Sequence, residues 1–276
     1  MSTDNQTFSV VTPNFNMARY LPETIESVLD NLSPGDQYFI VDGGSTDGSV
    51  EIIKTYQKQL TRWVSERDKG HGDAVAKGFR LASGAYYSWI NSGDLLLKGA
   101  LHTARASLSE TRADLIYGDD YAIDEQSRII KRAFGKAVSL RVAMLYGGWT
   151  PLQDACFWRS SIYHATGGIN PAHCVALDYD FFLRVSVAGR CLYVPKVFSA
   201  FRLHGGQISI ARKREYSAVR SDSRSRVRRE LGVGFFKWTL LNMFYFVWLR
   251  LEVHLLNRLR RQVITSGTDV KRMTAG

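Results

Sequence analysis

Four aspartates stand where apolar runs meet polar loops or where helix-like segments begin: Asp42, Asp73, Asp94 and Asp178. Asp42 ends the run FIVD and precedes GGSTDGS, and Asp94 follows YYSWINSG. The carboxyl ends of strands in an open parallel sheet form its ligand-binding edge. Carboxylates at that edge can hold Mg²⁺ or Mn²⁺, which take oxygen ligands and share them with phosphates. The same residue types also build ordinary turns and helix caps, so a structural role stays open for each.

His204 follows the last strand-like run and is a further candidate metal ligand or phosphate contact. A lone histidine is more often an ordinary surface or core residue. The sequence has no GxxxxGK[ST] motif and no GxGxxG after its first strand-like run, which argues against ATPases and dinucleotide enzymes. It has no HExxH or GxSxG motif either, which argues against zinc proteases and α/β-hydrolases. A nucleotide and metal site built from aspartates at strand ends remains.

The elements that must position these residues alternate along the first hundred positions. Strand-like runs cover 8–12, 38–42, 62–66 and 86–91, and helix-like segments cover 21–32, 49–60 and 73–82. Alternation at this spacing predicts βαβ units in a parallel sheet, and therefore an α/β fold. Further on, DLIYGDDYAID and SRIIKRAFG predict a hairpin off the sheet, 177–189 predicts a helix that ends at Gly189, and CLYVPKVFSAFRLH predicts a final strand.

The composition places the sites in a folded body with a basic tail. Apolar residues make up 45% of the 276 residues, enough for a substantial core. Residues 1–210 contain 21 basic and 21 acidic residues, whereas 211–261 contain 13 and 4, which gives that segment a charge of +9. We therefore expect a catalytic or binding domain at 1–210 and a separate basic, aromatic-rich helical tail at 211–276. Three cysteines without a CxxC pair, and a start without a basic and apolar leader, favour a reducing, cytoplasmic location.

Several segments in this order and spacing resemble family 2 glycosyltransferases. They are VVTPNFNMARYLPETIESV, FIVDGGSTDGSVEII, SERDKGHGDAVAKGFRLASGAYYSWINSGDLL, PLQDACFWRSSIYHATGGIN, ALDYDFFLRVSVAG and FRLHGGQIS, which together span roughly residues 7–210. The resemblance implies the GT-A fold, a Rossmann-like mostly parallel sheet flanked by helices. It also implies an enzyme that uses a nucleotide-diphosphate sugar, with UDP favoured, and Mn²⁺ or Mg²⁺.

The resemblance assigns a role to each candidate residue. Asp42 would accept a hydrogen bond from the nucleotide base, with Thr12 and Pro13 lining the same pocket. Asp73 would lie near the base and ribose, and Gly93 would belong to the nucleotide site. Asp94 would be the main metal ligand, in a motif that reads Asn91-Ser92-Gly93-Asp94 where the family has more carboxylates. His204 would lie near the metal and diphosphate.

The acceptor side of the resemblance centres on Asp178. This residue matches the position of the catalytic base, although Leu177 stands where a glutamate usually precedes it. A base is needed because an acceptor hydroxyl is a poor nucleophile until its proton is accepted. Direct attack opposite the leaving diphosphate implies inversion at the anomeric carbon. Asp180 is the weaker candidate for the base, and either aspartate could instead cap a helix.

Trp149 and Gln153 lie in the segment that the family places close to the acceptor, although a large aromatic side chain such as Trp149 usually packs in a core. The QxxRW signature of processive synthases is missing, which favours transfer of a single sugar. The expected acceptor is a cell-envelope polysaccharide or lipid-linked saccharide precursor.

The tail predicts a surface interaction. The basic segment 211–230 precedes FFKWTLLNMFYFVWLRLEVHLL. Its apolar core, Trp238 to Leu249, is interrupted only by Thr239 and Asn242 and is too short to span a bilayer. An interfacial helix with a polybasic lead, bound to an anionic membrane surface at the cytoplasmic face, is the expectation. A helix packed on the catalytic domain and a homo-oligomer contact remain alternatives. Nucleic-acid binding is the rival for the basic charge, and a catalytically silent nucleotide-sugar-binding protein is the rival for the whole chain.

Overall fold

The first half of the chain forms the parallel part of a single sheet. The computed structural model describes residues 6–137, 139–146, 149–206, 211–234, 236–245 and 247. The first strands are β1 (Phe8–Asn14), β2 (Gln37–Asp42), β3 (Arg62–Ser65) and β4 (Tyr86–Trp89), and β1 pairs in parallel with β2 and β4. They alternate with α1 (Leu21–Leu29), α2 (Ser49–Tyr56) and α3 (His71–Leu81). The predicted βαβ alternation is confirmed.

The second half extends this sheet with mixed strand directions. The strand order is β3-β2-β1-β4-β8-β6-β9-β5. It includes β5 (Leu95–Leu96), β6 (Leu115–Ile123), β8 (Cys156–Arg159) and the long β9 (Cys191–Arg202), and β7 (Ile129–Ala133) pairs with β6 off this path. Strand β8 is antiparallel to both β4 and β6, whereas β9 is parallel to β6. The predicted hairpin of 114–135 is β6 and β7, and the predicted last strand is β9.

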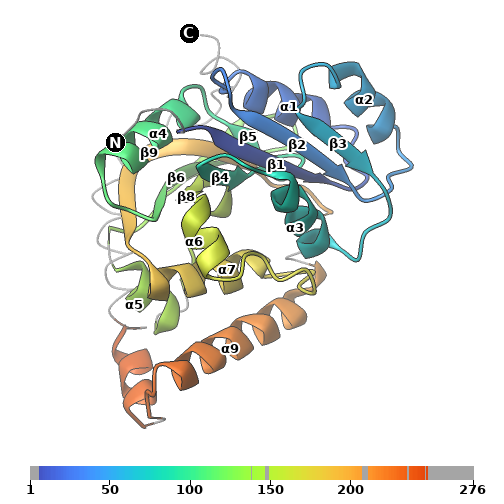
Figure 1. The fold of residues 1–276 in the computed structure, drawn as a ribbon. Coiled ribbons are helices and arrows are strands. Elements are labelled where there is room, and N and C mark those ends of the chain that lie inside the picture. Colours follow the sequence, from blue (N-terminus) through green and yellow to red (C-terminus); the bar gives the residue numbers. More distant parts are fainter. Residues whose placement is uncertain are drawn as a thin grey trace.

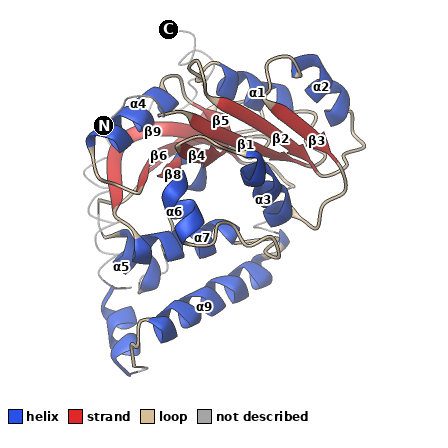
Figure 2. Cartoon of the chain, in the orientation of Figure 1, coloured by secondary structure: helices blue, strands red, loops and turns tan. Residues whose placement is uncertain are grey.

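Helices cover both faces of the sheet (Figures 1 and 2). One face packs against α1, α2 and α4 (Ala100–Glu110). The other packs against α3, α5 (Leu140–Leu145), α6 (Ser160–Ala165) and α7 (Leu177–Ala188). The two-residue period of a strand divides its side chains between these cores. In β4, for example, Tyr87 and Trp89 enter the core under α3 and α7, whereas Tyr86 enters the other core.

The beginning of the expected tail is a helix that packs on this body. Helix α9 (Lys213–Glu230) lies along the outer side of α7, at the bottom of the molecule in Figure 1. Residues 236–245 continue as helix after a short turn. Within the described part of the chain, none of the helices has the length and apolar character needed to cross a membrane.

Candidate active site

Asp42 is completely buried at the carboxyl end of β2, where it orders the loop that follows. Its carboxylate accepts hydrogen bonds from the Asn14 amide at 2.6 Å and the Ser65 hydroxyl at 2.7 Å. It also accepts the Gly44 and Ser45 backbone N–H groups at 3.1 and 2.9 Å, and the Ser45 hydroxyl at 2.5 Å. A carboxylate offers about four acceptor positions, so these donors occupy it fully.

The charge of Asp42 is stabilised by these donors. Burial raises the pKa of this carboxyl, but the hydrogen bonds from Ser45, Ser65 and Asn14 outweigh that effect, and the pKa lies below its ordinary value. Asp42 is therefore a charged anchor of the loop after β2. Its neighbour Asn14, at the end of β1, is paired with it across the two strands.

Thr12 and Pro13 lie beside Asp42 in β1. The Thr12 hydroxyl is buried and hydrogen-bonded to the Tyr38 hydroxyl at 3.0 Å. The Pro13 carbonyl accepts the backbone N–H and the hydroxyl of Ser92 at 3.3 and 3.1 Å. This contact joins the end of β1 to the Asn91–Asp94 motif. The residues expected to bind the nucleotide base and the residue expected to bind the metal therefore lie at one edge of the sheet.

Phe15 was not among the sequence candidates, although it directly follows the first strand. Its side chain is 61% exposed, unusual for a phenylalanine at the end of a core strand. A Cβ at Gly43 would lie 3.3 Å from the Phe15 ring and 2.5 Å from the Asp68 carboxylate, so the missing side chain lets both groups approach the loop. An exposed ring beside a glycine-rich loop is a suitable surface for stacking a flat base.

Asp73 lies in the first turn of α3, at the same edge. Its carboxylate accepts the Lys69 backbone N–H at 3.1 Å and lies 3.5 Å from the Lys77 ammonium. Burial raises the pKa of Asp73, but the Lys69 N–H and the Lys77 charge outweigh it, so the pKa is lowered.

The side chain of Asn91 connects three segments at the end of β4. Its amide nitrogen donates to Gln153 at 2.8 Å and to Asp94 at 3.2 Å, and its carbonyl oxygen accepts the His71 Nε2 hydrogen at 2.9 Å. Gln153, expected on the acceptor side, thus supports the motif that holds Asp94, and it also donates to the Trp89 carbonyl at 2.7 Å. His71 and Asn91 were missed as site residues, although both lie inside motifs that the sequence singled out.

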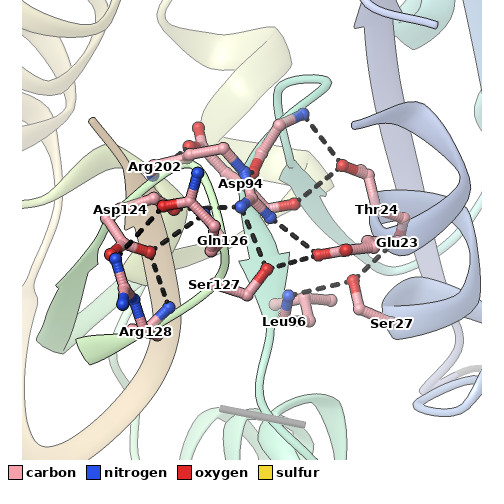
Figure 3. A network of polar contacts seen from close by, with 11 residues as sticks. Glu23, Thr24, Ser27, Asp94, Leu96, Asp124, Gln126, Ser127, Arg128 and Arg202 are labelled. Carbon is pink, nitrogen blue, oxygen red and sulfur yellow. Dashed lines mark hydrogen bonds and ion pairs between the residues drawn. The ribbon is translucent and has the colours of Figure 1, made fainter. Parts of the chain in front are cut away.

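Gly93 has a φ of +112°, a conformation that side chains other than glycine rarely adopt. Its N–H donates to the Thr24 hydroxyl at 2.9 Å, and that hydroxyl donates to the Asp94 carbonyl, also at 2.9 Å (Figure 3). Helix α1 therefore holds the backbone of the motif. A side chain at position 93, an aspartate included, would be strained in this conformation.

Asp94 is buried behind Arg202, the last residue of β9 (Figure 3). The Arg202 N–H donates to one carboxylate oxygen at 3.0 Å, and the guanidinium donates to the Gly93 carbonyl at 2.8 Å and to Glu23 at 2.9 Å. Arg202 is only 1% exposed and lies 4.8 Å from the Tyr20 ring centre. This arginine, missed in the sequence, clamps β9 to α1 around the motif.

Two further buried carboxylates, Asp120 and Asp154, adjoin Asp94. Burial and the charge of Asp154 raise the pKa of Asp94 well above its ordinary value, and burial raises that of Asp154 to about 6. Burial and the charges of Asp154 and Asp94 likewise raise the pKa of Asp120, which shares a hydrogen bond with Asp154. A cation beside this group would favour the ionised carboxylates. Asp120 lies in the GDD run of β6, and Asp154 lies in the QDA run just before β8.

Among the described residues, protein side chains alone do not supply enough ligands for a metal ion. Over the described ranges, no three His, Cys, Asp or Glu side chains gather so that they could hold a metal ion by themselves. Each oxygen of Asp94 accepts one of the hydrogen bonds given above, which leaves a second acceptor position on each. Asp94 therefore fits a metal that takes one protein carboxylate and completes its shell with diphosphate and water oxygens.

His204 lies beyond Arg202, with its ring 5.8 Å from the Tyr20 ring and its Nδ1 accepting the Gly206 N–H at 3.2 Å. Burial lowers the pKa of His204, as does the positive charge of Arg202, and Glu125 opposes them. The ring is consequently neutral at pH 7, and its Nε2 is the nitrogen that could reach a ligand.

Asp178 is half-buried in the first turn of α7. Burial raises the pKa of its carboxyl, against hydrogen bonds from its own backbone N–H and that of Tyr179 and against the charge of Arg220. The charges of Asp154 and Asp178 both raise the already high pKa of the Cys156 thiol in β8.

Asp180 and Trp149 have structural partners. Asp180 is buried and pairs with Arg184 at 2.8 Å and with Arg226 of α9. Trp149 packs against Tyr117, with ring centres 6.0 Å apart, and the Lys136 ammonium lies 5.5 Å from its ring. Of the two aspartates near the start of α7, Asp178 is the one without such an ion pair within 4 Å among the described residues.

Several proteins are similar to this chain in sequence. The chondroitin synthase of Escherichia coli is 26% identical over 247 residues, which cover 84% of this chain and 34% of the synthase. Glycosyltransferase GlyG of Streptococcus pneumoniae serotype 4 is 33% identical over 125 residues, 44% of this chain and 41% of GlyG. The PGL/p-HBAD biosynthesis glycosyltransferase of Mycobacterium bovis is 28% identical over 182 residues, 64% of this chain and 68% of that protein. The chain spans about a third of the length of the chondroitin synthase and about two fifths of GlyG.

Solved structures share the fold. TarS 1–349 of S. aureus, in complex with UDP-GlcNAc, superposes with a TM-score of 0.59 at 19% identity, covering 73% of this chain and 60% of TarS. The mannosyltransferase PcManGT of Pyrobaculum calidifontis, in complex with GDP-Man and Mn²⁺, has a TM-score of 0.58 at 17% identity, covering 80% and 64%. These likenesses confirm the expected GT-A class of α/β fold.

The family model described as glycosyl transferase family 2 matches residues 9–166. That segment holds the strand ends of β1, β2 and β4, the loop ordered by Asp42 and the motif ending at Asp94. Because the match extends over more than half of the chain, the protein belongs to glycosyl transferase family 2.

Proposed function

We propose that this protein is an inverting glycosyltransferase that moves a single sugar from a nucleotide-diphosphate sugar, UDP-linked, to a hydroxyl of an acceptor. The acceptor would be a cell-envelope polysaccharide or a lipid-linked saccharide precursor. The observation that carries the proposal is Asp178, a half-buried carboxylate of raised pKa in the first turn of α7. A base must have a pKa near the working pH, and burial moves Asp178 in that direction.

The nucleotide would bind along the ends of β1 and β2. Phe15 would stack on the base, the loop ordered by Asp42 would surround it, and Asp73 would lie near the ribose. Asp42 contributes through the loop, since its own acceptor positions are occupied inside the protein. A UDP donor is supported by the TarS complexes with UDP-GlcNAc and UDP, and the PcManGT complex with GDP-Man makes guanine the base to test against it.

Asp94 would hold Mn²⁺ or Mg²⁺, with His204 as a second ligand or a diphosphate contact. The metal would stabilise the charge of the leaving diphosphate. Arg202 keeps the Asp94 carboxylate aimed by its backbone N–H and fixes Gly93 by its guanidinium. Asn91 and Gln153 hold the second oxygen of Asp94 in place.

Asp178 would accept the proton of the acceptor hydroxyl as its oxygen bonds to the anomeric carbon. The bond from that carbon to the diphosphate breaks on the opposite side, so the configuration inverts. Asp180 is already committed to Arg184 and Arg226, which supports Asp178 as the base.

The first experiment is calorimetric titration of UDP, dTDP, GDP and CDP, each with Mn²⁺ and with EDTA. It uses the wild type, Asp94→Ala, Asp42→Ala and, as a control, Asp30→Ala, an exposed carboxylate beyond the far end of α1. Selective, Mn²⁺-dependent binding that is lost in the first two variants and kept in the control is the expected result. Base-selective binding that ignores both metal and Asp94 would remove the metal from the proposal.

Hydrolysis of a sugar donor that carries the tightest-binding nucleotide distinguishes an enzyme from a catalytically silent binding protein. We expect slow, Mn²⁺-dependent release of the sugar with inverted anomeric configuration, measured by NMR, and its loss in Asp178→Asn. Tight nucleotide binding without any hydrolysis, and without transfer to simple sugar alcohols, would favour the silent alternative.

The helix after α9 supports a membrane-surface partner. Phe236, Leu240, Met243, Phe244 and Val247 are between 53% and 77% exposed, and their spacing places them on one helical face. The exposed Lys237 lies within this stripe in the sequence, and the exposed Arg229 lies near the end of α9 before it; both would attract anionic lipid. We infer that this face lies on the anionic, cytoplasmic surface of a membrane, where a lipid-linked acceptor would also be found. The remainder of the predicted interfacial segment, 248–261, lies outside the described residues.

Cosedimentation with phosphatidylglycerol-containing liposomes tests this surface. Leu240→Asp should reduce binding about tenfold, because a buried leucine contributes about 1.5–3 kcal/mol, whereas Ser217→Asp on the exposed side of α9 should reduce it much less. A concentration-dependent dimer that Leu240→Asp dissolves would assign the stripe to a second copy, and an RNA or DNA shift at moderate salt would assign the charge to nucleic acid.

A further inference from the structure

The inner face of α9 is as closely fitted to α7 as a core helix. Tyr216, Arg220, Ser223 and Val227 recur at the four- and three-residue spacing of one helical face. Ser223 and Val227 are 1% exposed, and Tyr216 and Arg220 are half-buried. The exposed members of the helix, such as Arg229, point away from this contact.

Asp180 fixes the position of α9 along α7. The Ser223 hydroxyl donates to its Oδ1 at 2.7 Å, and the guanidinium of Arg226 pairs with the same oxygen. Its Oδ2 pairs with Arg184 of α7 itself. A carboxylate that is buried and shared between two helices determines which residues of each helix are opposed.

One turn earlier in α9, this alignment places Arg220 against the beginning of α7. The Arg220 guanidinium lies 4.5 Å from the centre of the Tyr179 ring and 5.5 Å from that of the Tyr216 ring. The Tyr179 hydroxyl is held in turn by the Met144 carbonyl at 2.7 Å. Two aromatic rings therefore hold the guanidinium next to the residue that follows Asp178.

The groups around Asp178 act on its charge in opposite directions. Burial raises the pKa of Asp178, while the backbone N–H groups of Tyr179 and of Asp178 itself and, to a smaller extent, the positive charge of Arg220 lower it. Asp178 in turn raises the pKa of Tyr216 on α9 and of Cys156 on β8, both of which remain neutral at pH 7. Arg220 is thus the basic side chain that acts on this carboxylate from the facing helix.

We propose that Arg220 is a positioning residue for Asp178, and that α9 is for this reason a part of the catalytic centre. The proposal rests on the proposed role of Asp178 as the base. The charge of Arg220 opposes the effect of burial on this half-buried carboxylate, which would otherwise retain its proton up to a higher pH.

The test is a ¹³C NMR titration of carboxyl-labelled aspartate in the full chain, with the Asp178 signal assigned from its loss in Asp178→Asn. Arg220→Gln and Arg220→Met should each move the Asp178 midpoint upward by about 0.5–1 pH unit. Arg220→Met preserves packing between the two rings, and Arg220→Lys preserves the charge and should keep the midpoint. Arg229→Gln, an exposed arginine of the same helix, is the matched control.

The acid limb of donor hydrolysis, measured with UDP-GlcNAc and Mn²⁺, should move with the NMR midpoint while KM for the donor stays constant. An unchanged midpoint in both charge-removing variants, with melting curves that show them folded, overturns the proposal. If the midpoint moves but Asp178→Asn hydrolyses donor normally, the contact is real and the assignment of Asp178 as the base is wrong.

Discussion

At the scale of single residues, the site is organised by hydrogen-bonding side chains whose partners are other groups of the protein. Asp42 takes hydrogen bonds from three segments, and Asn91 links His71, Gln153 and Asp94. Such groups are poor direct ligands but good supports, because a buried carboxylate or amide with all its partners has one stable orientation. The residues left to contact a ligand are then Phe15, whose ring is exposed, Asp94, whose carboxylate oxygens keep acceptor positions, and Asp178, which has no ion pair within 4 Å among the described residues.

Gly93 shows how backbone geometry limits this motif. Gly93→Ala should lower the free energy of unfolding by about 1–3 kcal/mol, the cost of holding a non-glycine residue in a rarely populated conformation. A Cβ there would also lie 3.1 Å from the Met17 side chain. Urea denaturation would measure the loss. Gly234→Ala, where no heavy atom lies within 4 Å of the added Cβ, serves as the control, and equal stability of both variants would contradict the reasoning.

At the scale of elements, each motif is held by a partner that is distant in the chain. Arg202 of β9 binds Glu23 of α1, 179 residues away, and α9 is fixed to α7 through Asp180. Contacts of this kind stabilise the site as a consequence of folding, so their loss should disturb stability and activity together.

The docking of α9 should depend on pH through Asp180. Burial raises the pKa of Asp180, but Arg184, Ser223 and Arg226 outweigh it, and the pKa is lowered. A lowered folded-state pKa stabilises the protein above the unfolded value of about 3.9, and this contribution disappears as the pH falls through the folded value. Asp180→Asn should therefore lose about 3 kcal/mol of unfolding free energy at pH 7 and less at pH 3. Urea curves at both pH values would show this, with the exposed Asp222→Asn as the control.

At the scale of the whole molecule, the tail and the body are less separate than composition suggests. The expected boundary at residue 210 matches the change in charge, but α9 packs on α7 and contributes Val227 to the main core. Of the alternatives for the tail, a helix packed on the catalytic domain describes α9. Apolar side chains of the following helix, from Phe236 to Val247, are exposed, as a surface contact requires.

Deletion of residues 211–276 tests this connection. We expect the shortened chain to bind nucleotide within about twofold of the full chain, because α9 packs mainly against α7 and not against β1 or β2. Its donor hydrolysis should fall by about threefold to tenfold on the acid limb, since Asp178 would lack its neighbouring positive charge and its midpoint would rise by about 0.5–1 pH unit. Isothermal titration and NMR of released sugar would measure the two quantities. Hydrolysis at the full rate would show that α9 is dispensable for chemistry.

Much of the fold and part of the site could be predicted from the sequence. The βαβ alternation and the aspartates at strand ends are local patterns, so β1 to β4 and the neighbourhoods of Asp42 and Asp94 were expected. Arg202, Asp120 and Asp154 were not, because their meaning depends on strands that pair across the chain and bring buried charges together. The hydrogen bonds to Asp42 likewise come from three separate segments, at Asn14, Ser45 and Ser65, so they could not be predicted from one stretch of sequence.

The shared carboxylate of Asp180 has a consequence for how such chains can diverge. Because one face of α9 is matched to the start of α7, substitutions at 216, 220, 223 and 226 should covary with those at 178–180 among related chains, while the outward positions drift. An exchange of C-terminal segments between two relatives would therefore change the surroundings of Asp178 together with the surface that the tail contacts. Recombination between family members should succeed most often where α7 and α9 are inherited together.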